Sequence, residues 1–148
     1  MSLVKKTRIF FHFSTRQKFL FFRALFLSGL VRFTLSFLPF RKVMKWLGTD
    51  SIETDKLPDP ETLQYRTEVK TALALADRYT FWKTECYTRS LTAKILLRKK
   101  GIPSTLYIGF YKDETGVYKG HAWLRSADML VTGNMPELHL YQVHSFFS

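Results

Sequence analysis

The residues of this chain best suited to nucleophilic chemistry are one cysteine and four histidines. The sequence places Cys86 in the first turn of a helix that runs to Gly101, with Thr84 as its N-cap. Free backbone amides and the positive end of the helix dipole stabilise a thiolate at such a position. A lone cysteine is more often a small buried apolar residue, so a reactive thiol also needs a base to accept its proton.

His121 is the histidine best placed to be that base, because it lies at the start of a predicted strand. A ring on a strand can project rigidly toward a facing helix terminus. The other three lie in the basic N-terminal arm or in an irregular tail: His12, His139 and His144. We therefore expect a Cys86–His121 pair, with the backbone amide of Cys86 supplying half of an oxyanion hole. The single cysteine excludes a multi-cysteine zinc site, and no metal or bound cofactor is predicted.

Three residues are candidates for orienting the His121 ring: Asn134, Asp128 and Glu137. A hairpin that turns at Ala127-Asp128 would put Asn134 opposite His121 and leave Asp128 roughly 20 Å away along the strand. Asn134 is therefore expected to orient the ring, as the amide does in Cys-His-Asn proteases. Asp128 and Glu137 stay as alternatives. Trp82 and Trp123 are candidates for cleft walls, although tryptophans near a core more often serve packing.

The elements that must position these residues are helices first and strands after them. Capping signals and periodicity predict helices from Thr15 to before Pro39, over Phe40–Leu47, from Pro60 to about Tyr79, and from Cys86 to Gly101. Alternating residues predict strands over Thr105–Phe110, Lys119–Ser126 and Met129–Thr132. The stretch after Pro136 shows no clean period. The fold class is therefore α+β, with a helix start packed on a small antiparallel sheet.

The chain length fits one compact unit, with a basic helical region over residues 1–50 and a core over residues 51–148. The net charge is +11, and ten Lys and Arg residues precede the first acid, Asp50. An acidic partner is therefore expected, docking on Arg16, Lys18 and Arg23. Charges interrupt the apolar segment 17–40, so we predict no transmembrane span and leave a peripheral membrane contact open. The single cysteine and the lack of a secretory signal predict a cytoplasmic protein.

The order of these motifs resembles a known family. The run from Cys86 through Gly101-Ile102-Pro103, then Leu106-Tyr-Ile-Gly-Phe110, then His121-Ala-Trp, is similar to the transglutaminase-like peptidases of lasso-peptide maturation, found in microcin-processing proteins. Leu38-Pro39-Phe40-Arg41 and Trp46-Leu47-Gly48 resemble the N-terminal region of the same family. Two positions depart from it, because Asn134 and Arg125 stand where acidic residues are usual.

This resemblance implies a papain-like core with a Cys-His-acid triad that removes the leader from a lasso-peptide precursor. It also implies a separate leader-recognition partner, the cyclase of the same pathway as a further partner, and ATP use by the wider maturation system. Two other functions remain open. One is acyl transfer to an amine by the same Cys-His chemistry. The other is a non-enzymatic basic module for nucleic acid or an anionic membrane, against which no nucleic-acid motif is present, so no nucleic-acid partner is predicted.

Overall fold

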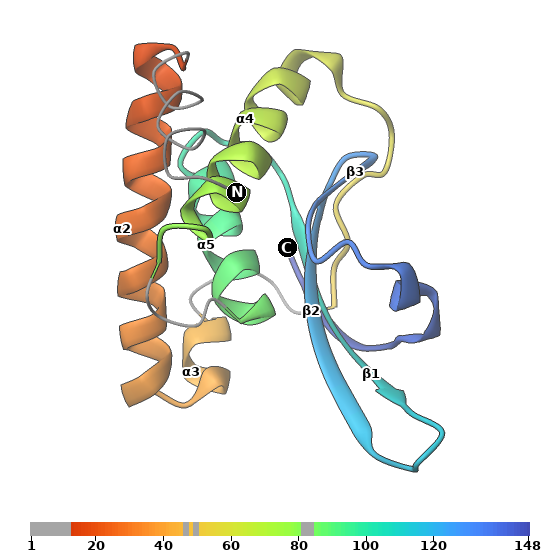
Figure 1. Cartoon of the computed structure of the whole chain (residues 1–148). Helices are drawn as coiled ribbons and strands as arrows, with labels where there is room; N and C mark the ends of the chain where they lie inside the picture. Colours follow the sequence, from red (N-terminus) through yellow and green to blue (C-terminus); the bar gives the residue numbers. More distant parts are fainter. Residues whose placement is uncertain (1–12, 46–47, 49–50, 81–84) are drawn as a thin grey trace.

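The structure is a computed structural model, and it describes residues 13–45, 48, 51–80 and 85–148. Three layers follow one another across the molecule (Figure 1). Helix α2 (Thr15–Phe37) forms the first layer, α4 (Pro60–Ala76) and α5 (Cys86–Arg98) form the second, and a four-stranded antiparallel sheet forms the third. Helices precede strands along the chain, and Cys86 is the first residue of α5. The predicted α+β class is therefore confirmed.

Helix α2 begins with the capping box that the sequence predicts. The Ser14 hydroxyl accepts a hydrogen bond from the Gln17 amide at 3.2 Å, and the Gln17 side chain accepts from the Ser14 amide at 3.0 Å. The helix ends at Phe37, and α3 (Phe40–Lys45) starts after Pro39, whose ring cannot continue a helix. The predicted end of α3 at Leu47 lies outside the described residues. The buried side of α2 contacts α4 and α5 through Leu20, Phe21, Ala24 and Val31.

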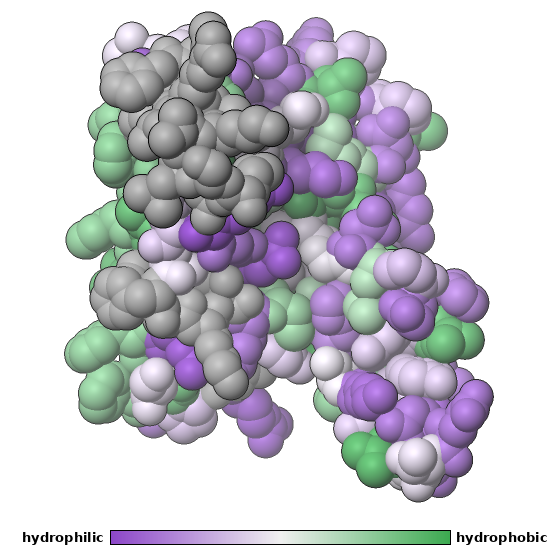
Figure 2. Space-filling view, viewed as in Figure 1, coloured by the Kyte–Doolittle hydropathy of each residue, from purple (hydrophilic) through white to green (hydrophobic). Residues whose placement is uncertain are grey.

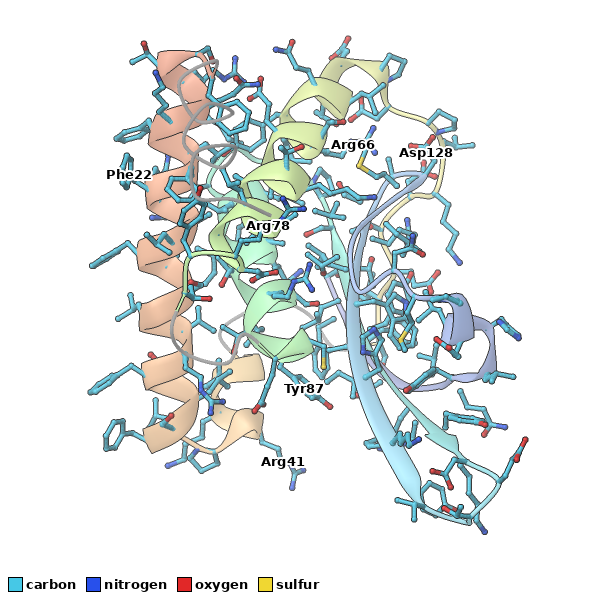
Figure 3. All side chains as sticks on the ribbon, in the orientation of Figure 1. Phe22, Arg41, Arg66, Arg78, Tyr87 and Asp128 are labelled. Carbon is cyan, nitrogen blue, oxygen red and sulfur yellow. The ribbon has the colours of Figure 1, made fainter. Side chains whose placement is uncertain are left out.

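Helix α4 carries a buried arginine that ties the second layer to the sheet. Arg66 is 0% exposed. It donates to the Asp59 carbonyl at 2.6 Å and to the Ser126 carbonyl at 2.7 Å, and its guanidinium lies 3.2 Å from the Asp128 carboxylate. A buried charge needs such partners, because removing it from water is costly. Arg66 thus fixes the β2–β3 turn to the start of α4 (Figure 3).

The sheet has the strand order β3-β2-β1-β4. Its strands are β1 (Thr105–Lys112), β2 (Tyr118–Ser126), β3 (Met129–Thr132) and β4 (Gln142–Phe147). In the β1–β2 hairpin, Gly109 pairs with His121 and Tyr107 with Trp123. Alternate residues point to opposite faces of a strand. Leu106, Ile108 and Leu124 belong to the buried core, so His121 and Trp123 lie on the face away from it.

A bulge changes the register that the sequence suggested for β3. Ser126 pairs with Met129 and Arg125 with Leu130, but Leu124 pairs with Thr132, so Val131 is an extra residue on β3. Strand β3 then ends at Thr132. The expected pairing of Asn134 with His121 is therefore wrong, because a two-residue turn followed by regular pairing does not allow for this bulge.

Two further expectations need correction. The N-cap of α5 is Glu85 rather than Thr84, which lies outside the described residues. The C-terminal stretch, for which the sequence predicts no regular element, contains the short 3-10 helix η1 (Pro136–Leu140) and β4, which pairs with β1. Strand β4 is mostly exposed or half-buried and its register with β1 shifts after Ile108, so it has no clean alternation for a sequence to display.

Lys94 of α5 makes stability depend on pH. Its side chain is buried and its ammonium donates to the Ser104 carbonyl at 2.9 Å, but desolvation still lowers its pKa to about 8. Between about pH 8 and 10.5 the unfolded chain binds a proton that the folded chain has lost, so stability should rise with pH there. The full gain is about 3 kcal/mol. Urea unfolding of wild type and Lys94→Met across this range checks it, and equal slopes would contradict the expectation.

Candidate active site

Within the part of the chain that the structure describes, no side chain caps the first amides of α5. The Glu85 side chain makes no capping hydrogen bond and lies instead 3.5 Å from Arg32 of α2. Cys86 follows as the first helical residue, with a free and half-buried thiol. The Cys86 amide lies at this helix start, which is the position that an oxyanion donor would need.

The first turns of α5 dock on the part of the sheet that carries His121. The Ser90 hydroxyl, one turn after Cys86, donates to the Ala122 carbonyl at 3.2 Å and lies 2.8 Å from the Thr132 hydroxyl. The Tyr87 hydroxyl lies 3.7 Å from the place where a Cβ on Gly120 would stand. Burial, and next the charge of Cys86, raise the pKa of Tyr87. Helix α5 is thus held against the residues on both sides of His121.

The His121 ring is oriented by a backbone carbonyl. Its Nε2 atom lies 2.9 Å from the Gly133 oxygen. A carbonyl oxygen can only accept, so Nε2 must donate its proton. In the neutral ring this tautomer leaves Nδ1 with a lone pair, which is the state that a general base needs.

Gly133 is the residue that this arrangement requires. Its φ angle is +78°, which L side chains rarely adopt, and a Cβ there would lie 2.4 Å from the Trp123 Cβ. The chain can therefore turn back toward His121 after β3 only with glycine at this position. The His121 ring also stacks on Trp123, at 6.0 Å between centroids, and contacts Tyr141 at 5.4 Å. Trp123 is buried between Tyr107 and His121, so it supports the His121 ring.

The structure brings Cys86 and His121 to one end of the sheet without joining them. Their side chains make no hydrogen bond to each other in the described structure. The ring reaches Gly133, just past the end of β3, and Ser90 of α5 reaches Thr132, the last residue of β3. The His121 ring and the first turns of α5 therefore lie beside the same end of β3, on opposite faces of the sheet. Catalytic hydrogen bonds are often long in ligand-free structures and tighten when substrate binds.

The three candidates for orienting His121 lie in different surroundings. Asn134 is exposed and follows the glycine whose carbonyl holds the ring. Asp128 lies in the β2–β3 turn, as expected of a turn residue, and pairs with Arg66. Glu137 is exposed in η1. None of the three contacts the ring among the described residues, and the position expected for a side chain is taken by the Gly133 backbone.

The other predicted site residues lie apart from this edge. Arg16 and Arg23 belong to α2, on the other side of α5 from the sheet, where Arg16 lies 3.1 Å from Glu68 and Arg23 lies over the Phe19 ring. Lys18 is a half-buried residue of the same helix. Trp82 lies outside the described residues. No three His, Cys, Asp or Glu side chains gather in a metal-binding group within residues 13–45, 48, 51–80 and 85–148.

A family model of the transglutaminase-like superfamily matches residues 32–145. The chain belongs to the transglutaminase-like superfamily. The match begins inside α2 and includes Cys86, His121 and Gly133. No curated protein and no solved structure gives a significant match. Membership in the transglutaminase-like superfamily indicates activity of the cysteine-peptidase or acyltransferase type. The lasso-peptide role stays a prediction.

Sequence reasoning missed the structural roles of three residues in this transglutaminase-like fold: Ser90, Gly133 and Arg125. Ser90 looks like an ordinary helix residue, because its partners are distant in sequence. Gly133 follows a predicted strand, where a glycine can mark a backbone position that needs positive φ, so a signal was present. The Arg125 guanidinium donates to the Thr54 and Asp55 carbonyls at 2.8 Å and so holds the segment before α4 against the sheet. The acid expected at position 125 could not do this.

Proposed function

We propose that this protein is a cysteine peptidase that removes the leader from a lasso-peptide precursor, with Cys86 as nucleophile and His121 as base. The observation that carries the proposal is the hydrogen bond from His121 Nε2 to the Gly133 carbonyl. It fixes the tautomer: Nε2 carries a proton, so in the neutral ring Nδ1 is the nitrogen that can accept the thiol proton. The helix-start position of Cys86 supports the thiolate that results.

The expected reaction has two halves. His121 Nδ1 takes the Cys86 proton, and the thiolate attacks the scissile carbonyl while the Cys86 amide stabilises the oxyanion. The C–N bond then breaks, His121 gives its proton to the departing amine, and the leader stays on Cys86 as a thioester. His121 next takes a proton from water, the hydroxide oxygen attacks the thioester, and the C–S bond breaks. This releases the leader as a free acid and regenerates the thiol, with no other reactant.

Substrate recognition is the part of this function that the family resemblance supplies. We assign leader binding to a separate partner protein and place ATP use elsewhere in the maturation system. The same thioester could be attacked by an amine instead of water, which would make the protein an acyl transferase. The half-exposed thiol is compatible with both acceptors.

Product chemistry in heavy-oxygen water tests the peptidase assignment. The protein, its partner and a precursor peptide are incubated together, and the leader is analysed by mass spectrometry. Hydrolysis should place one heavy oxygen in the new leader carboxylate, because water resolves the thioester. A leader joined to an amine without heavy oxygen would show acyl transfer and overturn the peptidase assignment. A mixture without the protein controls for spontaneous cleavage.

A further inference from the structure

Helix α2 is apolar on the side that faces away from the protein. Its outward residues are large and from 50% to 72% exposed: Phe19, Phe22, Phe26, Leu30, Phe33 and Phe37. They recur every three or four residues, so they form one stripe about 27 Å long. Figure 2 shows this stripe as hydrophobic surface along the α2 side of the molecule. We call these six residues the α2 stripe.

The stripe offers no side-chain hydrogen bonds to a partner. The two hydroxyl residues near its C-terminal end bond their own helix, Thr34 to the Leu30 carbonyl and Ser36 to the Arg32 carbonyl, both at 2.9 Å. Protein–protein interfaces usually contain about one hydrogen bond per 100–200 Å². A face whose polar groups are all satisfied internally suits the interior of a lipid layer better.

The charged side chains that α2 itself carries are all basic, although Arg16 and Arg32 pair with Glu68 and Glu85 of neighbouring segments. No acidic residue occurs before Asp50. Lys18 and Arg23 lie near the start of the stripe, and the Arg23 guanidinium lies 5.6 Å from the centre of the Phe19 ring. Arg41 and Lys42 are exposed on α3, just after its end. Anionic headgroups attract basic residues that border an apolar helix face, by about 1 kcal/mol for each Lys or Arg.

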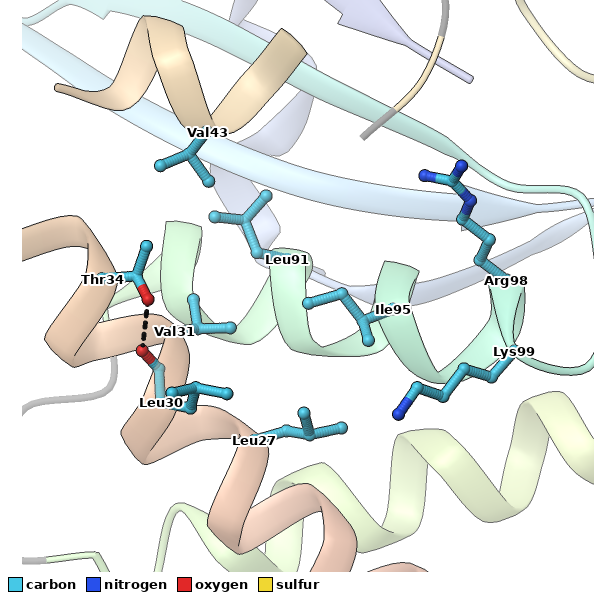
Figure 4. Close-up of a pocket in the computed structure, with 9 residues that line it drawn as sticks. All are labelled: Leu27, Leu30, Val31, Thr34, Val43, Leu91, Ile95, Arg98 and Lys99. Atoms are coloured by element: carbon cyan, nitrogen blue, oxygen red, sulfur yellow. Dashed lines mark hydrogen bonds between the residues drawn. The ribbon is translucent and has the colours of Figure 1, made fainter. Parts of the chain in front are cut away.

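A hollow beside the stripe extends its apolar surface. It encloses about 520 Å³ between α2, α3 and α5, and it shares Leu30 with the stripe. Its lining is apolar except for Thr34 and two cations, Arg98 and Lys99, and the Lys99 ammonium reaches toward Leu27 (Figure 4). An acyl chain with an anionic headgroup has the matching distribution of apolar surface and charge.

We propose that the α2 stripe docks the protein on an anionic lipid bilayer, with α2 lying in the membrane surface. Helix α2 is long and apolar enough to cross a membrane by length and composition. Its other side holds Leu20, Ala24 and Val31 in the core, so crossing would require it to leave α4 and α5. A second copy is a poorer occupant, because either orientation of two α2 helices brings like charges together. Docking leaves open the sheet, which lies on the other side of α4 and α5 from α2 (Figure 1).

Vesicle flotation of the full chain tests this docking. Wild type should float with phosphatidylcholine vesicles that contain about 30% phosphatidylserine, and less with phosphatidylcholine alone. Phe26→Asn/Phe33→Asn should lower the partition coefficient about a hundredfold, because two rings no longer enter lipid. The matched control is Ile52→Asn/Leu57→Asn, which removes two exposed apolar residues of the segment before α4. It should bind like wild type.

Charge reversal separates the electrostatic attraction to lipid headgroups from the apolar contact of the α2 stripe. Lys18→Glu/Arg23→Glu should weaken binding to anionic vesicles at least tenfold and leave binding to neutral vesicles unchanged. Circular dichroism establishes that each variant is folded.

Failure of wild type to bind vesicles, or equal binding by the folded Phe26→Asn/Phe33→Asn variant, would overturn the proposal. The proposal would also be overturned if ultracentrifugation showed a wild-type dimer that is lost in this variant and is unaffected by vesicles. The Lys18→Glu/Arg23→Glu variant could also bind vesicles like wild type and yet lose affinity for partner-bound precursor. The basic residues would then bind the partner, and the membrane assignment would be wrong. Leader release in solution is measured separately, so this result is independent of the peptidase assignment.

Discussion

Cys86→Ala is expected to lower leader release by at least about a thousandfold while the protein stays folded. The loss should be this large because no second thiol exists in the chain to form the thioester. The fold should survive because Cys86 is half-buried at a helix start and lies outside the buried core cluster. Single-turnover cleavage of partner-bound precursor, followed by mass spectrometry, gives the rate, and urea unfolding gives the stability.

The companion variant His121→Ala shows whether the two residues act as one unit. If His121 activates Cys86, the double variant should be no slower than the slower single variant, because the members of a catalytic unit are not additive. If the rate losses of the two single variants multiplied in the double variant, Cys86 and His121 would act in separate steps. Normal turnover by folded Cys86→Ala would end the assignment of Cys86 as nucleophile.

Gly133→Ala is expected to cost between about a hundredfold and ten-thousandfold in turnover, which is the range seen when the group that orients a catalytic histidine is lost. The added Cβ would lie 2.4 Å from the Trp123 Cβ, and the left-handed backbone disfavours alanine as well. Relief of this clash must move the Gly133 carbonyl away from His121 Nε2. The rate of leader release and the urea midpoint should therefore both fall.

Two matched variants separate the displaced Gly133 carbonyl from backbone strain and from a role of the Asn134 side chain. Gly101 has a similar φ of +68° but nothing within 4 Å of an added Cβ, so Gly101→Ala measures backbone strain alone. It should lower stability and leave turnover of the folded protein unchanged. Asn134→Ala should stay within about tenfold of wild type, because its side chain is exposed and off the ring. If Asn134→Ala proved more damaging than Gly133→Ala, the Asn134 side chain would be the orienting group after all.

Local signals in the sequence were enough to predict most elements. The Ser14–Gln17 capping box and the Asp59-Pro60 start both act within a few residues, and both helices begin where these signals place them. Strands β1 to β3 were also predicted from their apolar residues, although the first five residues of β1 are all buried and do not alternate. The predicted superfamily was also right, since its motifs occur in order along the chain.

Features set by distant contacts could not be predicted in this way. The bulge at Val131 adds one residue to a hairpin, and no side chain signals it. Arg66 looks like a solvated helix charge, yet its partners come from the start of α4 and from the β2–β3 turn. The group that orients His121 is a main-chain atom, which no side-chain pattern in the sequence can indicate, so Asn134 was predicted instead.

The position of β4 has a consequence for how the protein folds. Strand β1 pairs with β2 through a short hairpin but with β4 across more than thirty residues, so its two edges close at different times. Contacts between distant residues form late, because closing a long loop costs more entropy. During folding, β1 therefore has one edge open while the hairpin is already formed, and such an edge can pair with another chain. We expect the refolding yield to fall as protein concentration rises.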